Sequence, residues 1–197
     1  MTDDLGFGLL GAGLIAPFHA KALRDSRGGR LVAVCDVNRE RAAKVAAEFG
    51  VTAYNDLAEM LRDPAVDAVG VLTPNHLHSA AVLDCFRAGK HVIVEKPPAM
   101  SLRETDEMIA AADAAGLKFA CTVQCRVRKS VQAVKRAVDE GRFGRVLQAD
   151  AYMKWFRTAE YYHSDPWRSS RQSGAGVTVQ HAFHYIDLLQ YLVGPAT

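Results

Sequence analysis

The feature that most restricts the fold of this chain is a glycine-containing loop close to its N-terminus. An apolar run at residues 5–10 is followed by the sequence GAGLIA at residues 11–16, and a helical pattern follows. In a G-x-G-x-x-A pattern, Gly11 permits a tight turn, Gly13 lets a phosphate approach the backbone, and Ala16 allows close helix–strand packing. The N-terminus of the helix adds free N–H groups and a positive dipole end. A loop of this kind between a strand and a helix predicts a dinucleotide-binding α/β domain.

Short apolar runs alternate with amphipathic segments through the first part of the chain. Strands are expected at residues 5–10, 31–35, 67–72, 91–94 and 117–123, and helices at residues 15–25, 39–49, 76–88 and 101–115. Gly50 and Gly116 follow expected helices, as C-terminal glycines commonly do, and Ser101 with Glu104 forms a capping-box pattern. Strands that alternate with helices predict a parallel sheet covered on both faces. We therefore expect a Rossmann-type NAD(P)-binding domain at residues 1–123.

The end of the second expected strand carries an acid, Asp36, which bears on the choice of cofactor. An acid is expected there, about 20 residues after the glycine loop. A carboxylate accepts hydrogen bonds from a ribose 2′-hydroxyl and repels a 2′-phosphate. Asn38 is neutral, and Arg39 is the nearby cation that favours a 2′-phosphate. The pattern predicts NAD as the cofactor, with NADP as the alternative.

The composition argues against several other classes of protein. The net charge is +2 with histidine neutral, which does not indicate a nucleic-acid partner. No run approaches the roughly 18 apolar residues of a membrane span. The first four residues hold two acids and no basic group, so we expect no signal peptide and a cytoplasmic location. Cys121 and Cys125 form a C-x3-C pair without a second pair, so we expect reduced thiols and no metal.

The pattern changes after residue 123. A helix is expected at residues 128–140, a longer strand with polar–apolar alternation at 146–154, a long polar loop at 156–176 and a helix at 177–192. Alternation of this kind fits an antiparallel sheet with one face in water. Since one strand cannot form a sheet alone, residues 124–197 are expected to be the start of a truncated α+β domain with an open antiparallel sheet.

Two polar segments follow strands of the expected parallel sheet. Thr73-Pro74-Asn75 comes after one strand, and Glu95-Lys96-Pro97 comes after another. The carboxyl ends of parallel strands are where open α/β sheets bind ligands. A lysine close to a positive cofactor ring and in apolar surroundings has a lowered pKa, so Lys96 could transfer a proton near neutral pH. The alternative interpretation is a surface lysine at a strand end.

Five segments in this order resemble the Gfo/Idh/MocA oxidoreductases, a family that includes inositol dehydrogenases and glucose–fructose oxidoreductase. They are Gly11-Ala12-Gly13, Thr73-Pro74-Asn75 with His78, Glu95-Lys96-Pro97, Trp167-Arg168, and GAGVTVQHAFHYID at residues 174–187. The resemblance implies a Rossmann domain followed by a mostly antiparallel α/β domain, with members longer than this chain. It also implies a homo-oligomer if the full C-terminal sheet is present. The lysine of the E-K-P element then lies beside the nicotinamide, and His184 works with it as acid or base.

The chain departs from the family pattern in the late motif. Many members carry an aspartate four residues before the histidine, where this chain has Gln180. A neutral amide can hold a substrate hydroxyl but cannot take its proton at pH 7, so Lys96 and His184 carry the acid–base role. His181 shares a helix face with His184 and is an alternative for that role. Aromatic and arginine side chains of the preceding loop, such as Tyr161 and Arg168, suit a polyhydroxylated ring.

These patterns give two sets of expected ligand-binding residues. The cofactor set is Gly11, Gly13, Leu14, Ile15, Asp36, Val37, Asn38, Thr73, Pro74, Asn75, His78, Glu95, Lys96, Gln124, Trp167 and Arg168. The substrate set is Lys96, Tyr161, Arg168, Gln180, His181 and His184. The expected function is hydride transfer between nicotinamide and a hydroxyl or keto carbon of a sugar, cyclitol or related polyol. The alternatives are a redox-neutral, NAD-dependent lyase or glycosidase, and a non-catalytic NAD(P)-binding protein.

Overall fold

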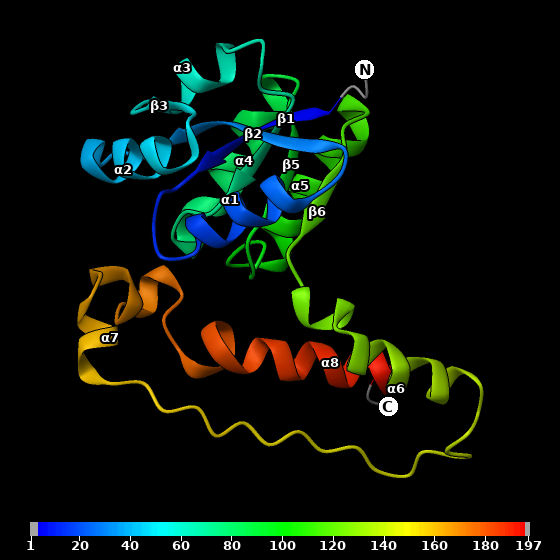
Figure 1. The fold of residues 1–197 in the computed structure, drawn as a ribbon. Helices are drawn as coiled ribbons and strands as arrows, with labels where there is room; N and C mark the ends of the chain where they lie inside the picture. The colour runs from blue at the N-terminus through cyan, green and yellow to red at the C-terminus, as the bar shows by residue number, and fades with distance from the viewer. Residues whose placement is uncertain (1–3, 196–197) are drawn as a thin grey trace. The chain divides into compact units, whose positions relative to one another are not determined.

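A computed structural model describes residues 4–195 of the chain (Figure 1). The chain divides into two compact units, Met1–Thr122 and Val123–Thr197. Among the described residues, no helix is long and apolar enough to cross a membrane.

The first unit is built on a parallel sheet of six strands. The strands are β1 (Leu5–Leu10), β2 (Gly29–Cys35), β3 (Thr52–Tyr54), β4 (Ala68–Val71), β5 (His91–Val94) and β6 (Phe119–Cys121). Their order is β3-β2-β1-β4-β5-β6, and every neighbouring pair is parallel. The chain moves outward from β1 to β3 and then returns to the other side of β1. The gap between β1 and β4 is therefore the switch point at which open α/β sheets bind ligands.

The helices of this unit follow the strands in alternation. They are α1 (Ala16–Asp25), α2 (Arg39–Phe49), α3 (Leu57–Arg62), α4 (His78–Arg87) and α5 (Leu102–Ala115), with a 3₁₀ turn at Asn75–Leu77. Ser101 caps α5 by accepting a hydrogen bond from the Glu104 N–H, and its hydroxyl donates to the Glu104 carboxylate. Gly50 and Gly116 end α2 and α5 in the left-handed conformation, with φ of 68° and 64°. The expected caps and stop signals are thus confirmed.

Two hydrophobic cores form on the opposite faces of the sheet, because successive strand residues point to opposite sides. Leu9 and Val34 pack with apolar residues of α1 and α2. Their chain neighbours Leu10 and Cys35 pack with residues of α3, α4 and α5. Helices therefore cover both faces (Figure 1), which confirms the expected Rossmann-type layers and leaves the strand ends free for a site.

The first unit agrees with the sequence expectation in most elements and differs at two short ones. The expected strands at residues 5–10 and 91–94 and the helix at 39–49 match β1, β5 and α2 residue for residue. The helix expected from residue 76 starts with the 3₁₀ turn. Strand β3 and helix α3, which have only 3 and 6 residues, were not predicted from the sequence. Segments this short do not repeat an apolar pattern often enough for it to be recognised in the sequence.

The second unit is mostly helical. It contains α6 (Lys129–Asp139), α7 (Ala159–His163), α8 (Phe183–Val193), a π-helical turn at Thr178–Ala182 and 3₁₀ turns at Gln124–Val127, Pro166–Arg168 and Arg171–Ser173. Helices α6 and α8 lie side by side (Figure 1). The Gln132 side-chain N–H donates to the Tyr191 hydroxyl across them, at 2.9 Å. The long loop expected at residues 156–176 contains α7 and the 3₁₀ turns at Pro166–Arg168 and Arg171–Ser173, so part of it forms short helices.

The strand expected at residues 146–154 is wrong. Residues 146–158 form no regular structure, and no strand follows β6 in the described part of the chain. A strand is stabilised by hydrogen bonds to its neighbours, and residues 123–195 supply no second strand to pair with. Without a partner strand, the large apolar side chains of this segment are exposed: Leu147 by 83%, Tyr152 by 80% and Phe156 by 83%. The open antiparallel sheet expected for the second domain is therefore not present in the described residues.

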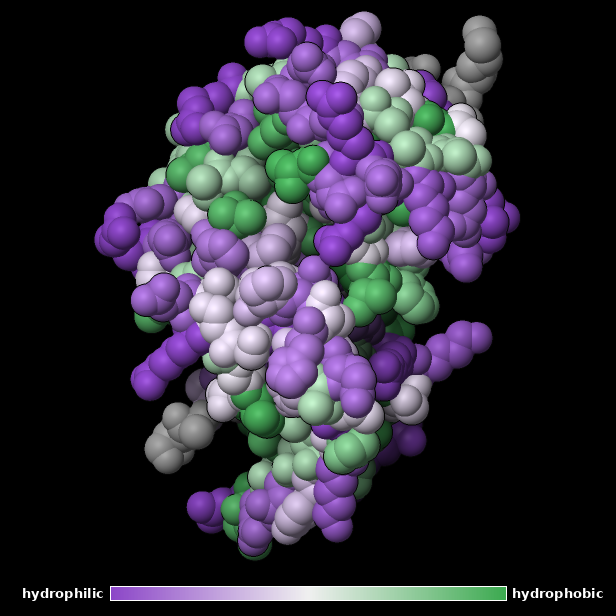
Figure 2. All heavy atoms as spheres, turned by 90° about the vertical axis from the view of Figure 1, so that its left-hand side faces the viewer, coloured by the Kyte–Doolittle hydropathy of each residue, from purple (hydrophilic) through white to green (hydrophobic). Residues whose placement is uncertain are grey.

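Large apolar side chains are also exposed beside the glycine loop. Leu14, Phe18 and Val37 are exposed by 65%, 70% and 93%. Figure 2 shows hydrophobic side chains at several separate places among hydrophilic ones on the face that it draws. Leu14 lies between β1 and α1, Phe18 lies in the first turn of α1, and Val37 follows β2.

Candidate functional site

The glycine loop leaves β1 at the centre of the sheet. Gly11 has a φ of 103°, and a Cβ at this position would lie 2.8 Å from the backbone oxygen of Leu72. The Gly11 N–H donates to the Cys35 carbonyl at 2.7 Å. The chain therefore turns between the ends of β2 and β4 in a space and a conformation that only glycine accepts readily.

The surroundings of Gly13 differ from those of Gly11. A Cβ at Gly13 would meet no described atom within 4 Å, so the space beside it is open. Ala16, at the start of α1, is fully buried against the sheet. Among residues 4–195, no side chain caps the N-terminus of α1. An open glycine and an uncapped helix start fit the pyrophosphate of a dinucleotide, because a helix N-terminus offers N–H groups and a positive dipole end to an anion.

Asp36 stands at the end of β2 and holds the glycine loop. Its Oδ2 accepts a hydrogen bond from the Ala12 N–H at 2.7 Å, and its Oδ1 accepts one from the Asn38 N–H at 2.8 Å. A carboxylate offers about four lone-pair positions, so the two backbone contacts leave acceptor capacity for a ribose hydroxyl. Asp36 is half-buried, whereas Val37 and Asn38 are exposed.

His78 links two loops at the carboxyl edge of the sheet. It is fully buried, and its ring nitrogens contact the carbonyl oxygens of Thr73 and Pro97, each at 2.8 Å. Burial lowers the pKa of His78 below its ordinary value, and the two carbonyl acceptors oppose that shift only in part. Each ring nitrogen faces one carbonyl oxygen, and a neutral ring donates to one of the two, so His78 lies between the Thr73-Pro74-Asn75 segment and the Lys96-Pro97 segment. Its contact with a cofactor stays a prediction.

Lys96 follows β5 directly and is half-buried, and its peptide bond to Pro97 is cis. The Lys96 N–H donates to Glu95 Oε2 at 3.1 Å, and the other Glu95 oxygen contacts His19 Nε2 at 2.8 Å. Burial raises the pKa of Glu95, but the hydrogen bond and charge of His19, with the N–H and charge of Lys96, hold that pKa below its usual value. An ionised glutamate therefore lies next to Lys96 and is bonded to the helix that follows the glycine loop.

The second unit gathers several of the expected substrate residues. The Arg168 guanidinium lies over the rings of Tyr161 and Trp167, with 4.8 Å and 4.7 Å from its Cζ to their centroids. It also donates to the Tyr161 hydroxyl at 3.0 Å. The ring of His181 lies 5.8 Å from that of Tyr161, centroid to centroid. These aromatic faces and donors form one cluster suited to a polyhydroxylated ligand.

The late H-x-x-D element places its two members in different surroundings. His184 is buried in α8, with its ring 6.0 Å from that of Phe183. Asp187, one turn further, accepts hydrogen bonds from two nitrogens of Arg126: its Oδ2 accepts from Nε at 2.9 Å, and its Oδ1 accepts from Nη2. A bidentate arginine–carboxylate pair of this kind fixes orientation. Asp187 thus joins α8 to the 3₁₀ turn at Gln124–Val127, which the sequence analysis did not foresee.

The structure places the expected site residues in two groups. The glycine loop, Asp36, Thr73 and Lys96 all follow the carboxyl ends of strands in the first unit. The second unit holds the expected residues Gln124, Tyr161, Trp167, Arg168, Gln180, His181 and His184, and all the others belong to the first unit. Lys96 and His184 are therefore in different units, and their convergence on one substrate stays a prediction.

His19 is the residue at this edge that the sequence analysis missed. It lies on α1 between the buried Ala16 and Ala20, and its side chain is 18% exposed. The sequence contained one signal for His19: a titratable side chain among the apolar residues on the buried face of a helix. Helical periodicity alone does not say which polar group lies opposite, because Glu95 is 76 residues away in the sequence.

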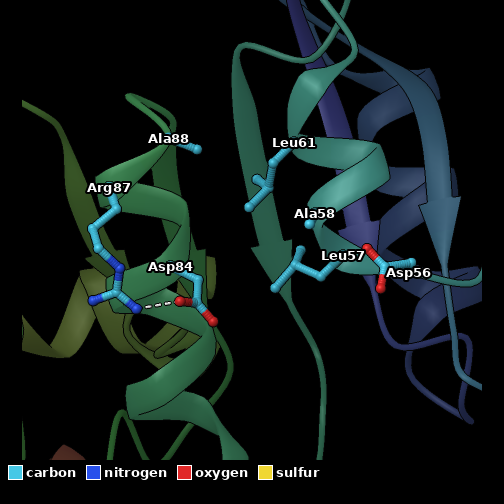
Figure 3. Close-up of a pocket in the computed structure, with 7 residues that line it drawn as sticks. All are labelled: Asp56, Leu57, Ala58, Leu61, Asp84, Arg87 and Ala88. Carbon is cyan, nitrogen blue, oxygen red and sulfur yellow. Dashed lines mark hydrogen bonds and ion pairs between the residues drawn. The ribbon is translucent and has the colours of Figure 1, made fainter.

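A groove elsewhere in the first unit contains none of the expected site residues. It lies between α3 and α4, has a volume of about 500 Å³, and is lined by Asp56, Leu57, Ala58, Leu61, Asp84, Arg87 and Ala88 (Figure 3). Arg87 and Asp84 form an ion pair on its α4 side (Figure 3). The glycine loop and Lys96 thus lie outside this groove.

The sheet order, the glycine loop and the acid after β2 together define a dinucleotide-binding Rossmann domain. The family model "Oxidoreductase family, NAD-binding Rossmann fold" (GFO_IDH_MocA) matches residues 5–123. The model of the GFO/IDH/MocA C-terminal domain matches residues 131–197. The chain belongs to the Gfo/Idh/MocA oxidoreductase family, as the sequence motifs indicated.

Individual relatives agree with this assignment. The chain is 34% identical to 1,5-anhydro-D-fructose reductase of Ensifer adhaerens over 189 residues. The matched region covers 95% of this chain and 56% of that protein. The chain is 31% identical over 190 residues to myo-inositol 2-dehydrogenase of Thermotoga maritima, covering 95% and 54%. The WlbA dehydrogenase of Bordetella pertussis, solved in complex with NADH and UDP-GlcNAcA, superposes with a TM-score of 0.88 at 35% identity, covering 98% of this chain and 59% of that chain. The chain spans about half the length of the curated relatives it matches.

Proposed function

We propose that the chain binds NAD(H) and belongs to a dehydrogenase or reductase that acts on a hydroxyl or keto carbon of a sugar, cyclitol or related polyol. The observation that carries the proposal is the contact of Glu95 with His19. Because His19 is on α1, the contact sets the segment that contains Lys96 against the helix that begins at the glycine loop. A proton-transferring lysine and a dinucleotide site then share one edge of the sheet, as hydride transfer with proton transfer requires.

The residues of the first unit fit the cofactor. The open space at Gly13 and the start of α1 would hold the pyrophosphate, and Asp36 would accept hydrogen bonds from the adenosine ribose. The carboxylate of Asp36 repels a 2′-phosphate, which supports NAD over NADP. When bound, the nicotinamide supplies the hydride acceptor or donor.

Lys96 and His184 are proposed as the acid–base pair. In the oxidising direction one of them removes the proton of the substrate hydroxyl, and in the reducing direction it returns a proton to the ketone oxygen. Gln180, a neutral amide, would hold a hydroxyl without taking its proton. His181, which is also buried, is the alternative to His184.

The substrate class rests on the chemistry of the second unit and on the named relatives. Arg168 with Tyr161 and Trp167 offers stacking faces and forked donors for a ring that carries hydroxyl or anionic groups. The reductase and the dehydrogenase named above act on an anhydro-sugar and on an inositol. We propose a ligand of that chemical class for this chain.

The test combines cofactor binding with turnover. NADH and NADPH are titrated by nicotinamide fluorescence, and a panel of 1,5-anhydro-D-fructose, inositols and UDP-sugar acids is then screened for changes in nicotinamide absorbance. We expect tighter binding of NADH than of NADPH and turnover with at least one polyol or its ketone. Binding without any net change of the nicotinamide, together with conversion of a substrate, would show a redox-neutral enzyme instead. Lack of NADH binding would overturn the proposal.

A further inference from the structure

The Glu95 carboxylate joins two segments that are far apart in the sequence. One of its oxygens contacts His19 Nε2 on α1 at 2.8 Å, and the other accepts the main-chain N–H of Lys96 at 3.1 Å. Both side chains are largely buried, with 18% of His19 and 13% of Glu95 exposed. A carboxylate held at both oxygens in such a place has little freedom to turn, because each rotation would break one contact away from water.

We infer that His19 is a positioning residue for Lys96: its ring holds the Glu95 carboxylate, and that carboxylate holds the main chain of Lys96. On the other side, the Pro97 carbonyl contacts His78, so the Lys96-Pro97 segment has a second anchor. Loss of His19 should therefore loosen Lys96 without releasing the whole segment. The contact of His19 with this segment is made to Glu95, so we expect it to act on Lys96 through that carboxylate.

His19 also lies one turn from the start of α1, the helix end proposed to face the pyrophosphate. Ala16 of the same turn is fully buried, so the first turn of α1 is fixed to the sheet. Restraint of this turn by a bound dinucleotide should pass through His19 and Glu95 to Lys96. This part of the inference rests on the proposed function.

A pair of matched variants tests the positioning role. His19→Gln and His19→Met place unbranched side chains of similar length at the site, but only glutamine can donate a hydrogen bond to Glu95. Lys21→Met, on an exposed position of the same helix, is the control. Amide hydrogen exchange by NMR reports Lys96 N–H directly. The Glu95 N–H, which donates to the Val71 carbonyl at 2.9 Å, is the internal reference because it continues the hydrogen bonding between β4 and β5, two interior strands of the sheet.

We expect His19→Met to speed the exchange of Lys96 N–H by about ten-fold or more, with the Glu95 N–H changed by less than about two-fold. His19→Gln should keep the Lys96 rate within about three-fold of the wild type, and Lys21→Met should not change it. Equal Lys96 rates in wild type and His19→Met would overturn the inference. Equally fast exchange in the methionine and glutamine variants would also overturn it, since the hydrogen bond would then not be the cause.

NADH separates this inference from the proposed function. Addition of NADH should slow Lys96 exchange in the wild type and in Lys21→Met, but not in His19→Met. In turnover with a substrate found by the screen, His19→Met should lower kcat by at least about ten-fold, with the affinity for NADH within about three-fold. If the exchange results hold but NADH neither binds nor turns over, His19 positions Lys96 and the proposed function fails. If NADH binds and turns over while His19→Met leaves Lys96 exchange and kcat unchanged, the positioning role fails alone.

Discussion

The Asp36 carboxylate accepts a hydrogen bond from the main-chain N–H of Ala12 at 2.7 Å, so the end of β2 holds the glycine loop that follows β1. The second oxygen accepts the Asn38 N–H at 2.8 Å, at the start of α2. One side chain thus connects the turns after two neighbouring strands. The residue proposed to select the cofactor also orders the loop proposed to bind its phosphates.

Asp36→Ala should weaken NADH binding and reduce the preference for NADH over NADPH. A hydrogen bond to a charged group contributes about 1.5–3 kcal/mol, so the dissociation constant for NADH should rise by about ten-fold or more. Fluorescence titration with both cofactors measures the change. Asp36→Asn is the control, because its amide oxygen can still accept from Ala12 while the charge that repels a 2′-phosphate is gone. Tighter binding of NADPH than NADH by the wild type would contradict this assignment.

Alanine at Gly11 should lower the stability of the fold, whereas alanine at Gly13 should lower the affinity for NADH. Gly11→Ala places a Cβ 2.8 Å from the Leu72 carbonyl oxygen at a φ of 103°, so the free energy of unfolding should fall by about 1–3 kcal/mol or more. Gly13→Ala meets nothing within 4 Å, so stability should change by less than about 1 kcal/mol. Its methyl group would instead occupy the space proposed for the pyrophosphate and lower NADH affinity by about ten-fold or more. Urea unfolding and NADH titration of both variants check the contrast. A similar stability loss in both, or unchanged NADH affinity in Gly13→Ala, would contradict it.

Lys96→Ala and His184→Ala should each lower kcat by about 10²–10⁴, the usual scale of general acid–base catalysis. NADH affinity should change much less, since the pyrophosphate is proposed to lie at the glycine loop. Because both side chains are proposed to serve one proton transfer, the double variant should fall well short of the product of the two losses. His181→Ala should be milder. Steady-state kinetics of the four variants decides the matter: if His181→Ala costs more than His184→Ala, the acid–base role belongs to His181.

The stability of the first unit should depend on pH through His78. Burial lowers the pKa of this histidine below 6.5 in the folded chain, so below that pH the unfolded state binds more protons than the folded state. The stabilisation is therefore fully present above the unfolded pKa of about 6.5 and is lost as pH falls toward the folded pKa. Urea unfolding at several pH values should give a shallower dependence for His78→Gln than for the wild type. His163→Gln, at an exposed position of the second unit, is the control for the loss of a histidine. Identical pH curves for wild type and His78→Gln would show that His78 does not titrate differently on unfolding.

The first unit could be predicted in detail because its signals are local. Strands buried on both faces appear as short apolar runs, as at residues 91–94, and helix ends are marked by Ser101 and by Gly50 and Gly116 in the left-handed conformation. Elements of a few residues, such as β3, are too short to stand out as an apolar run or a repeated apolar pattern. The second unit was less predictable. The alternation at residues 146–154 indicates a strand, but a strand exists only where another one pairs with it, and none of the described residues after 123 does so.

The sequence by itself determined the family, the glycine loop, the acid after β2 and the lysine after β5, because each is a residue type at a fixed offset from a strand end. Tertiary structure decided which groups those residues contact. His19 and Glu95 are 76 residues apart, and Arg126 and Asp187 are 61 apart, so no local period relates them. Hydrogen-bond partners at such separations are set by how the sheet is ordered and how helices pack, and in this chain those contacts fix the main chain of Lys96 and the orientation of Asp187.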